Sequence, residues 1–147
     1  MKKSQGFTLI EVMIVVALIG IISAIAIPQY SDYVTRSRIP EATSTLADAR
    51  VRMEQFFQDN RNYNGDGLAA NVACGVAFTA TTHFAYACVS SASGMAYVVT
   101  ASGKNPGPMK GFTYTVDHTN TKGSSIAASS AWPATAAACW ITTRSGC

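Results

Sequence analysis

Few residues in this chain could carry chemistry: one carboxylate inside an apolar stretch, four cysteines and two histidines. Glu11 is the only charged residue between Phe7 and Ile27. His83 and His118 stand in strand-like runs, and no carboxylate pair, glycine-rich phosphate loop or nucleophile elbow accompanies them in the sequence. These patterns predict no catalytic site and no enzymatic activity.

The cysteines favour disulfides over metal or redox chemistry. They form no CxxC pair and no histidine lies beside them, so neither a zinc site nor a thioredoxin-like pair is predicted. Four cysteines allow three connectivities, and proximity in sequence favours Cys74 with Cys88 and Cys139 with Cys147. Two disulfides indicate an oxidising compartment, whereas free buried thiols are the alternative.

Charge does not predict a nucleic-acid partner. The chain has 147 residues and a formal net charge of +3, but Lys2 and Lys3 supply two of its eleven basic residues. Without them, nine basic residues face eight acidic ones, so binding to DNA is possible but unsupported. A solvated face or a contact between subunits is the better interpretation of four arginines: Arg36, Arg38, Arg50 and Arg52.

A turn-rich segment, DNRNYNGDG at residues 59–67, partly matches a calcium-binding loop. Asn60, Asn62, Asn64 and Gly65 take positions 1, 3, 5 and 6 of an EF-hand-like loop. Position 12 is Asn71 instead of a bidentate glutamate, and the three odd positions lack carboxylates. We therefore expect an ordinary loop, with no metal and no cofactor.

The apolar run from Phe7 to Ile27 is long enough to span a bilayer. As a helix it would be about 31 Å long, against a hydrocarbon core of about 30 Å. Lys2 and Lys3 precede it, which predicts a cytoplasmic N-terminus and an exported remainder.

Two ordinary explanations of this run are incomplete. A cleaved secretory signal would explain the lysines, and Ala24-Ile25-Ala26 imitates its cleavage site, but the run is longer than such signals. A plain uncleaved anchor fits the length. It leaves Glu11 unexplained unless the carboxylate snorkels to the membrane surface.

The N-terminus closely resembles the leader and methylation motif of type IV pilins. A short basic leader ends at Gly6, Phe7-Thr8-Leu9-Ile10-Glu11 follows, and the apolar run ends at Pro28. The resemblance implies that a prepilin peptidase cuts between Gly6 and Phe7 and methylates the new amine of Phe7. It also implies a single-pass precursor in the inner membrane. The pilus assembly machinery would extract this precursor into a helical homo-oligomer on the cell surface, together with minor pilins.

The resemblance also gives Glu11 a partner. Cleavage creates an ammonium at Phe7, and a charge buried in an apolar environment is costly unless it is paired. In the family the carboxylate meets the amine of a neighbouring subunit, which implies that Glu11 fixes the register of assembly. Gly20 and Pro28 are expected to weaken or kink the helix within or just after the run.

We expect an α+β fold in which the second half of a long N-terminal helix packs on a roughly four-stranded antiparallel sheet. The expected organisation is a leader at 1–6, a transmembrane and polymerisation helix at 7–27, and a head at 28–147. The helix should end near Asp59. Its buried seam would comprise Ile39, Ala42, Leu46, Ala49, Met53 and Phe56. The strand-like runs are 84–88, 95–100, 112–116 and 124–128, the last two joined by a turn at 120–123.

The expected function is that of a pilus subunit that supports adhesion, motility or DNA uptake. A loop closed by Cys139 and Cys147, containing Trp140 and Arg144, resembles the disulfide-bounded variable region of pilins. A minor pilin that primes or decorates the filament, and a pseudopilin of type II secretion, remain alternatives. Outside the family, the alternative is a membrane-anchored binding module.

Overall fold

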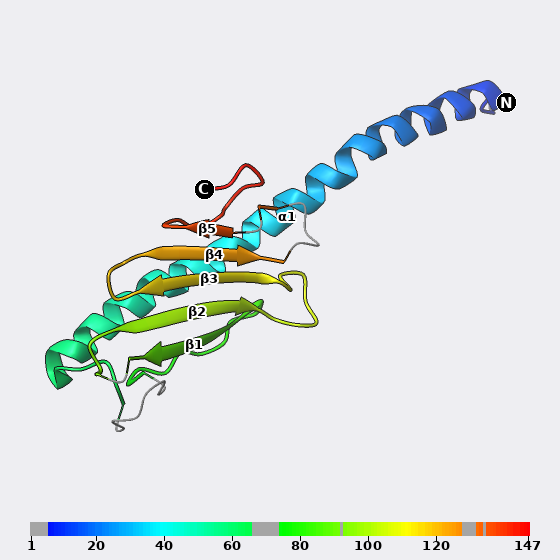
Figure 1. The fold of residues 1–147 in the computed structure, drawn as a ribbon. Coiled ribbons are helices and arrows are strands. Elements are labelled where there is room, and N and C mark those ends of the chain that lie inside the picture. The colour runs from blue at the N-terminus through cyan, green and yellow to red at the C-terminus, as the bar shows by residue number, and fades with distance from the viewer. Residues whose placement is uncertain (1–5, 66–73, 92, 128–131, 134) are drawn as a thin grey trace. The chain divides into compact units, whose positions relative to one another are not determined.

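The computed structural model describes residues 6–65, 74–91, 93–127, 132–133 and 135–147. The chain divides into an N-terminal unit that ends at Val34 and a head that begins at Thr35. The elements, in chain order, are α1 (Leu9–Asn60), β1 (Phe84–Ser90), β2 (Tyr97–Gly103), β3 (Phe112–Asp117), β4 (Lys122–Ile126) and β5 (Thr135–Ala137) (Figure 1). The α+β class expected from the sequence is confirmed, with one strand more than expected.

The part of α1 within the head buries a single stripe. Five of the six residues predicted for this seam are at most 1% exposed: Ile39, Ala42, Leu46, Ala49 and Met53. The sixth, Phe56, is only half-buried, and the ring of Phe57 packs against the core instead. The helix ends at Asn60, within a residue of the expected end. There Arg61 adopts a left-handed φ of 59° and its amide donates to the Phe57 carbonyl at 2.7 Å.

The sheet is an antiparallel meander in the order β1-β2-β3-β4-β5 (Figure 1). Alternate residues of β3 are buried, as the sequence pattern predicted: Phe112, Tyr114 and Val116. Their neighbours across β2 and β4 share this face, because paired residues of an antiparallel ladder point to the same side. The buried seam of α1 and this inner face form one hydrophobic cluster, so the expected two-layer packing is confirmed.

The turn between β3 and β4 lies earlier than the sequence suggested. The Asp117 carboxylate accepts hydrogen bonds from the amides of Thr119 and Thr121 at 2.9 and 2.8 Å, and Asn120 has a positive φ of 63°. The chain therefore reverses at residues 118–121 and β4 begins at Lys122 rather than Ser124. The predicted end of this strand, Ala128, lies outside the described residues.

Candidate assembly site

The N-terminal end of α1 is shaped by a cap that the sequence reading missed. The Glu11 amide donates to Thr8 Oγ1, and the Val12 amide donates to the Thr8 carbonyl, both at 3.3 Å. Thr8 and Glu11 have the Thr-x-x-Glu spacing of a capping box, a signal available from the sequence alone. Phe7, the residue that the resemblance makes the mature terminus, is non-helical and 84% exposed. The expected cleavage point after Gly6 thus lies one residue before the cap.

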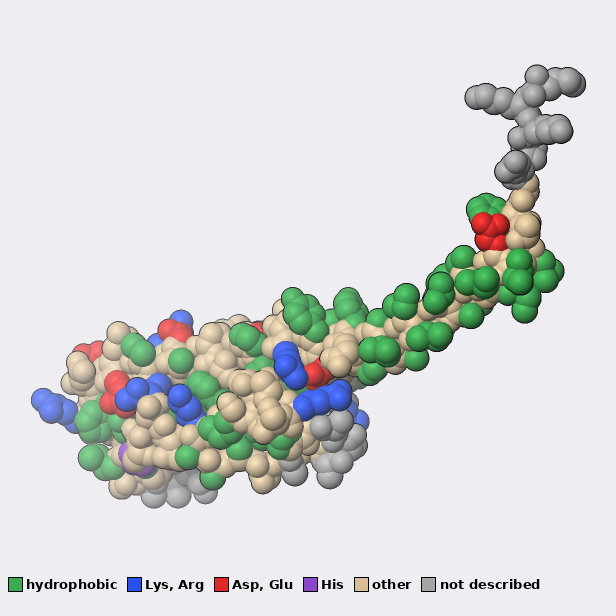
Figure 2. All heavy atoms as spheres, turned by 90° about the horizontal axis from the view of Figure 1, so that it is seen from above, with side chains coloured by type: hydrophobic (Ala, Val, Ile, Leu, Met, Phe, Trp, Pro, Cys, Tyr) green, Lys and Arg blue, Asp and Glu red, His purple; other side chains and the backbone are tan. Residues whose placement is uncertain are grey.

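No described residue of the N-terminal unit covers the apolar run of α1. Every large apolar side chain from Phe7 to Ile27 is exposed, from 49% at Val15 to 84% at Phe7. Figure 2 shows the resulting sleeve of hydrophobic side chains. By length and composition α1 could cross a membrane. Such a surface requires either lipid or other protein chains around it.

The α-helix is continuous through Gly20, Pro28 and Pro40. Pro40 therefore does not start a new helix. Ser31 Oγ donates to the Pro28 carbonyl at 2.9 Å, a local bond of a kind often found where a helix bends. A kink at Gly20 or Pro28 stays a prediction.

A polar contact fixes the segment before β1 to the helix of the head. The His83 amide donates to Glu41 Oε1 at 2.7 Å, and His83 Nδ1 lies 2.6 Å from Glu41 Oε2. Burial by itself would raise the pKa of Glu41, but hydrogen bonds from the His83 amide and from the side chains of Thr81 and His83 lower it to about 2. This contact could not be read from the sequence, because the partner of His83, Glu41, lies 42 residues earlier.

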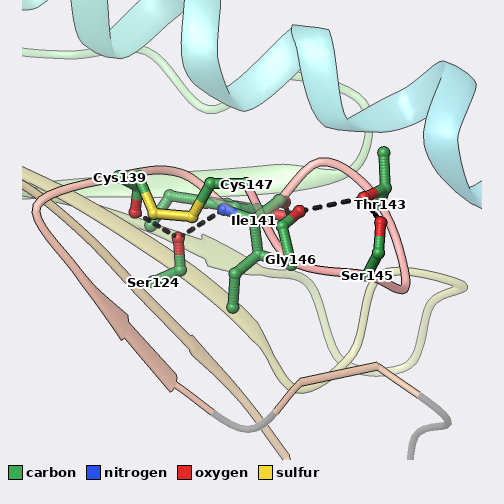
Figure 3. The surroundings of a disulfide bond; sticks show 8 residues. Ser124, Cys139, Ile141, Thr143, Ser145, Gly146 and Cys147 are labelled. Carbon is green, nitrogen blue, oxygen red and sulfur yellow. Dashed lines mark hydrogen bonds between the residues drawn. A yellow bond between two sulfur atoms is a disulfide. The ribbon is translucent and has the colours of Figure 1, made fainter.

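Both expected disulfides are present. Cys74 is bonded to Cys88 and Cys139 to Cys147, with Cα separations of 5.5 and 6.1 Å. The second closes the C-terminal loop, and the buried Ser124 of β4 holds that loop in place (Figure 3). Ser124 Oγ donates to the Cys139 carbonyl at 3.1 Å and accepts from the Ile141 amide at 2.9 Å. Nothing in the sequence distinguished this serine from its neighbours.

The outer face of the sheet carries a hollow of about 370 Å³ beside the C-terminal loop. It is lined mainly by threonine, serine and alanine, together with Asp117 and Lys122. Lys122 Nζ lies 4.8 Å from the centre of the Trp140 ring, whose Nε1 donates to the Thr115 carbonyl at 2.9 Å. Arg144 is exposed on the loop.

The described residues bring together no group of three His, Cys, Asp or Glu side chains that could hold a metal ion. Of the EF-hand-like positions, Asn64 is buried and forms an isolated bridge with Cys74, while Asn62 Nδ2 donates to the Asn60 carbonyl at 2.9 Å. Asn71, the twelfth position, lies outside the described residues. These contacts are those of a structured loop.

Comparison with known proteins decides the family. Residues 1–27 match the family model of the prokaryotic N-terminal methylation motif. Residues 28–125 match the model described as type IV minor pilin ComP, DNA uptake sequence receptor. The chain is a type IV pilin. The family expected from Gly6, Phe7 and Glu11 is thereby confirmed.

Curated relatives of this pilin include major and minor fimbrial proteins. The fimbrial protein EcpC of Eikenella corrodens is 39% identical over 110 residues, which cover 75% of this pilin and 69% of the relative. The type IV major fimbrial protein FimA of Dichelobacter nodosus is 49% identical over 77 residues, 52% of this pilin and 46% of FimA. A probable minor fimbrial protein of the same organism is 43% identical over 67 residues, 46% of this pilin and 42% of the relative. This pilin therefore spans less than half of the last two relatives.

A solved type IV pilin from Shewanella oneidensis is similar over 67% of this chain and 97% of that one, with 16% identity and a TM-score of 0.45.

Proposed function

We propose that this pilin is a structural subunit of a type IV pilus filament and has no enzymatic role. A prepilin peptidase removes residues 1–6 and methylates Phe7, and the subunit waits in the inner membrane as a single-pass protein. The assembly machinery then extracts it into a filament on the cell surface, alongside minor pilins. The observation that carries this proposal is the exposed apolar run of α1, which lipid covers before assembly and neighbouring copies cover afterwards.

In the proposed filament, Glu11 pairs with the Phe7 amine of an adjacent copy. Thr8 caps the helix between these two residues, so the amine and the carboxylate lie within about one turn at the same end of α1. The positive end of the helix dipole also favours a carboxylate at this place. Every copy therefore carries both an amine and a carboxylate at the same end of α1, so that the contact can repeat from one copy to the next.

Analysis of the N-terminus of the mature chain, purified from sheared surface fibres, tests the proposal. We expect N-methylphenylalanine at Phe7. A chain that starts at Ile27 indicates ordinary secretion, and one that starts at Met1 indicates an uncleaved anchor. Either result contradicts the proposal. The ratio of this chain to other pilins in the same fibres separates a major subunit from a minor one.

A second candidate function is capture of DNA, favoured by the match of residues 28–125 to a family described as a DNA uptake sequence receptor. The head offers two basic groups near Trp140, because half-buried Lys122 lies over that ring and exposed Arg144 stands on the adjoining disulfide loop. Cationic and aromatic groups together are features of nucleic-acid-binding surfaces.

Binding of duplex DNA to the purified pilin, measured over a range of salt concentrations, tests this second function. We expect Lys122→Gln to weaken binding and to make its salt dependence less steep, because a phosphate contact is lost. Arg52→Gln is the matched control, since Arg52 lies on α1 and pairs with Asp48 at 2.8 Å. Equal losses in both variants, or no binding by the parent chain, would contradict a DNA-binding site at Lys122.

A further inference from the structure

Two exposed tyrosines follow the apolar run of α1. Tyr30 is 70% exposed and Tyr33 is 71% exposed, both within the N-terminal unit. Because helical residues three apart are neighbours on one face, the two rings project from the same side of α1. The unit therefore presents a pair of large amphipathic side chains at one level of the helix, immediately after its most apolar part.

Tyrosine suits the boundary between lipid and water. Its ring is apolar and its hydroxyl is polar, so it concentrates at the level of the lipid headgroups at the ends of membrane spans. The residues from Val12 to Gln29, which precede this pair, include no charged side chain. The tyrosines therefore occupy the place along the helix at which a membrane span meets water.

The spacing between Tyr30 and Glu11 matches the thickness of a bilayer. At 1.5 Å per residue, α1 rises about 28 Å between the two residues. The hydrocarbon core of a typical bilayer is about 30 Å thick. Glu11, at one end of the uncharged stretch, is thus separated from the tyrosine pair, at the other end, by the thickness of one hydrocarbon core.

We propose that Tyr30 and Tyr33 form an interfacial anchor in the headgroup layer on the outer side of the membrane, and that this anchor holds Glu11 in the headgroup layer on the opposite side. The inference rests on the proposed function, because it requires that the precursor spans a bilayer. Its partner is a phospholipid surface.

This placement explains how a membrane span can contain Glu11. An ionised carboxylate at the centre of a bilayer is strongly unfavourable, whereas one at headgroup level remains hydrated. Held by the tyrosines, Glu11 stays out of the hydrocarbon until the subunit leaves the membrane. The carboxylate then needs the Phe7 amine only at the step of assembly, where that pairing sets the register.

Depth-dependent fluorescence quenching tests the anchor. The full-length chain is reconstituted as a monomer in phosphatidylcholine and phosphatidylglycerol vesicles. Their acyl chains carry bromine either near the headgroup or near the terminal methyl group. Tyr30→Trp and Tyr33→Trp each add one probe to the native Trp132 and Trp140, whose signal in the parent chain gives the baseline. Ile21→Trp, about midway between Glu11 and Tyr30, reports the middle of the span, and Val51→Trp, 55% exposed in the head, reports water.

We expect bromine near the headgroups to quench the probes at positions 30 and 33 at least about twofold more than bromine near the methyl end. The probe at position 21 should show the reverse order, and the probe at position 51 no quenching. If the probe at 21 is quenched but those at 30 and 33 are not, the anchor is overturned while the membrane precursor stands. If no bromolipid quenches the probe at 21, the proposed membrane stage itself fails.

A second measurement tests the link to Glu11. Leu9→Trp, placed two residues before the carboxylate, is compared in the parent chain and in a Tyr30→Leu, Tyr33→Leu chain. Leucine at positions 30 and 33 extends the apolar run, so the helix should move toward the cytoplasmic side to bury both residues. The probe at 9 then moves away from the acyl chains, and its quenching by bromine near the headgroups should fall by about twofold. Val51→Leu is the control and should change nothing. Unchanged quenching in the double-leucine chain would show that the tyrosines do not set the depth of Glu11.

Discussion

Glu11 performs a local task in α1 before any neighbouring subunit is considered. Glu11 occupies the third helical position after Thr8. The Thr8 hydroxyl accepts a hydrogen bond from the backbone amide of Glu11. A carboxylate in the first helical turn also interacts favourably with the positive end of the helix dipole. Loss of Glu11 therefore has two possible consequences, a weaker helix start and a missing charge partner, and a useful substitution must separate them.

Replacement of Glu11 by glutamine separates these roles, because glutamine retains the capping-box chemistry but carries no charge. We expect Glu11→Gln to leave cleavage and methylation largely intact and to lower the number of surface filaments. Thr8→Ala is the matched control, since it removes the cap, at a cost of about 1 kcal/mol, while the charge remains. Counting filaments by electron microscopy, with mass spectrometry of the mature terminus, checks both. Normal piliation in Glu11→Gln would contradict a charge-paired register.

The Glu41–His83 contact makes the stability of the head depend on pH. The folded pKa of Glu41 is about 2, below its ordinary value of 4.5. The carboxylate therefore contributes stability that is fully present above pH 4.5 and is lost as the pH falls toward 2. Because its side chain is 23% exposed, we expect on the order of 2 kcal/mol, less than the whole shift implies.

Urea unfolding of the full chain in a mild detergent measures this contribution. Glu41→Gln should lower the free energy of unfolding at pH 7, and its difference from the parent chain should shrink steadily as the pH approaches 2. Asp48→Asn is the control, because the ion pair of Asp48 with Arg52 is exposed and should contribute little. A constant difference across this pH range would rule out the carboxylate as its source.

At the scale of elements, the C-terminal loop depends on one hydroxyl of β4 as well as on its disulfide. Ser124→Ala removes both hydrogen bonds, which leaves the Ile141 amide and the Cys139 carbonyl without this partner. Ile141 is fully buried, so we expect a loss of about 1 to 3 kcal/mol and faster hydrogen exchange at its amide. Ser125→Ala, on the exposed face of the same strand, is the control. Equal exchange in the two variants would assign the loop's order to the disulfide alone.

The elements show how far the sequence could predict this fold. The seam of α1 and the alternation of β3 were readable because each is a local period, 3.6 residues in one and two in the other. The strand β5 was not readable, since Thr-Ala-Ala has no alternation and its place is decided by pairing with β4. Phe56 and Phe57 are adjacent, so the seam alone could not decide which ring packs against the core.

In the candidate site, too, local features could be predicted from the sequence and long-range contacts could not. The motif at Gly6, Phe7 and Glu11 lies within six consecutive residues and identified the family, and both disulfides follow from proximity along the chain. The Glu41–His83 contact and the bonds of Ser124 join residues that are far apart in sequence. Such contacts exist only once the helix and sheet have packed, so a single sequence carries no signal for them.

At the scale of the whole molecule, the two units have opposite relations to solvent. The head has its own core, built from the seam of α1 and the inner face of the sheet. The N-terminal unit exposes all the large apolar side chains between Phe7 and Ile27. An exposed apolar surface of this kind drives association in water, whereas lipid or detergent satisfies it.

This difference predicts that solubility changes while the fold of the head does not. A chain that begins at Thr35 should stay monomeric in buffer without detergent, because its large apolar groups are mostly inside the head core. The full chain should form large particles when detergent is removed. Light scattering measures both, and circular dichroism checks that the shortened chain retains helix and sheet. A full chain that remains monomeric without detergent would show that the apolar run is covered within a single copy. A shortened chain that does not fold would show that the head needs the first half of α1.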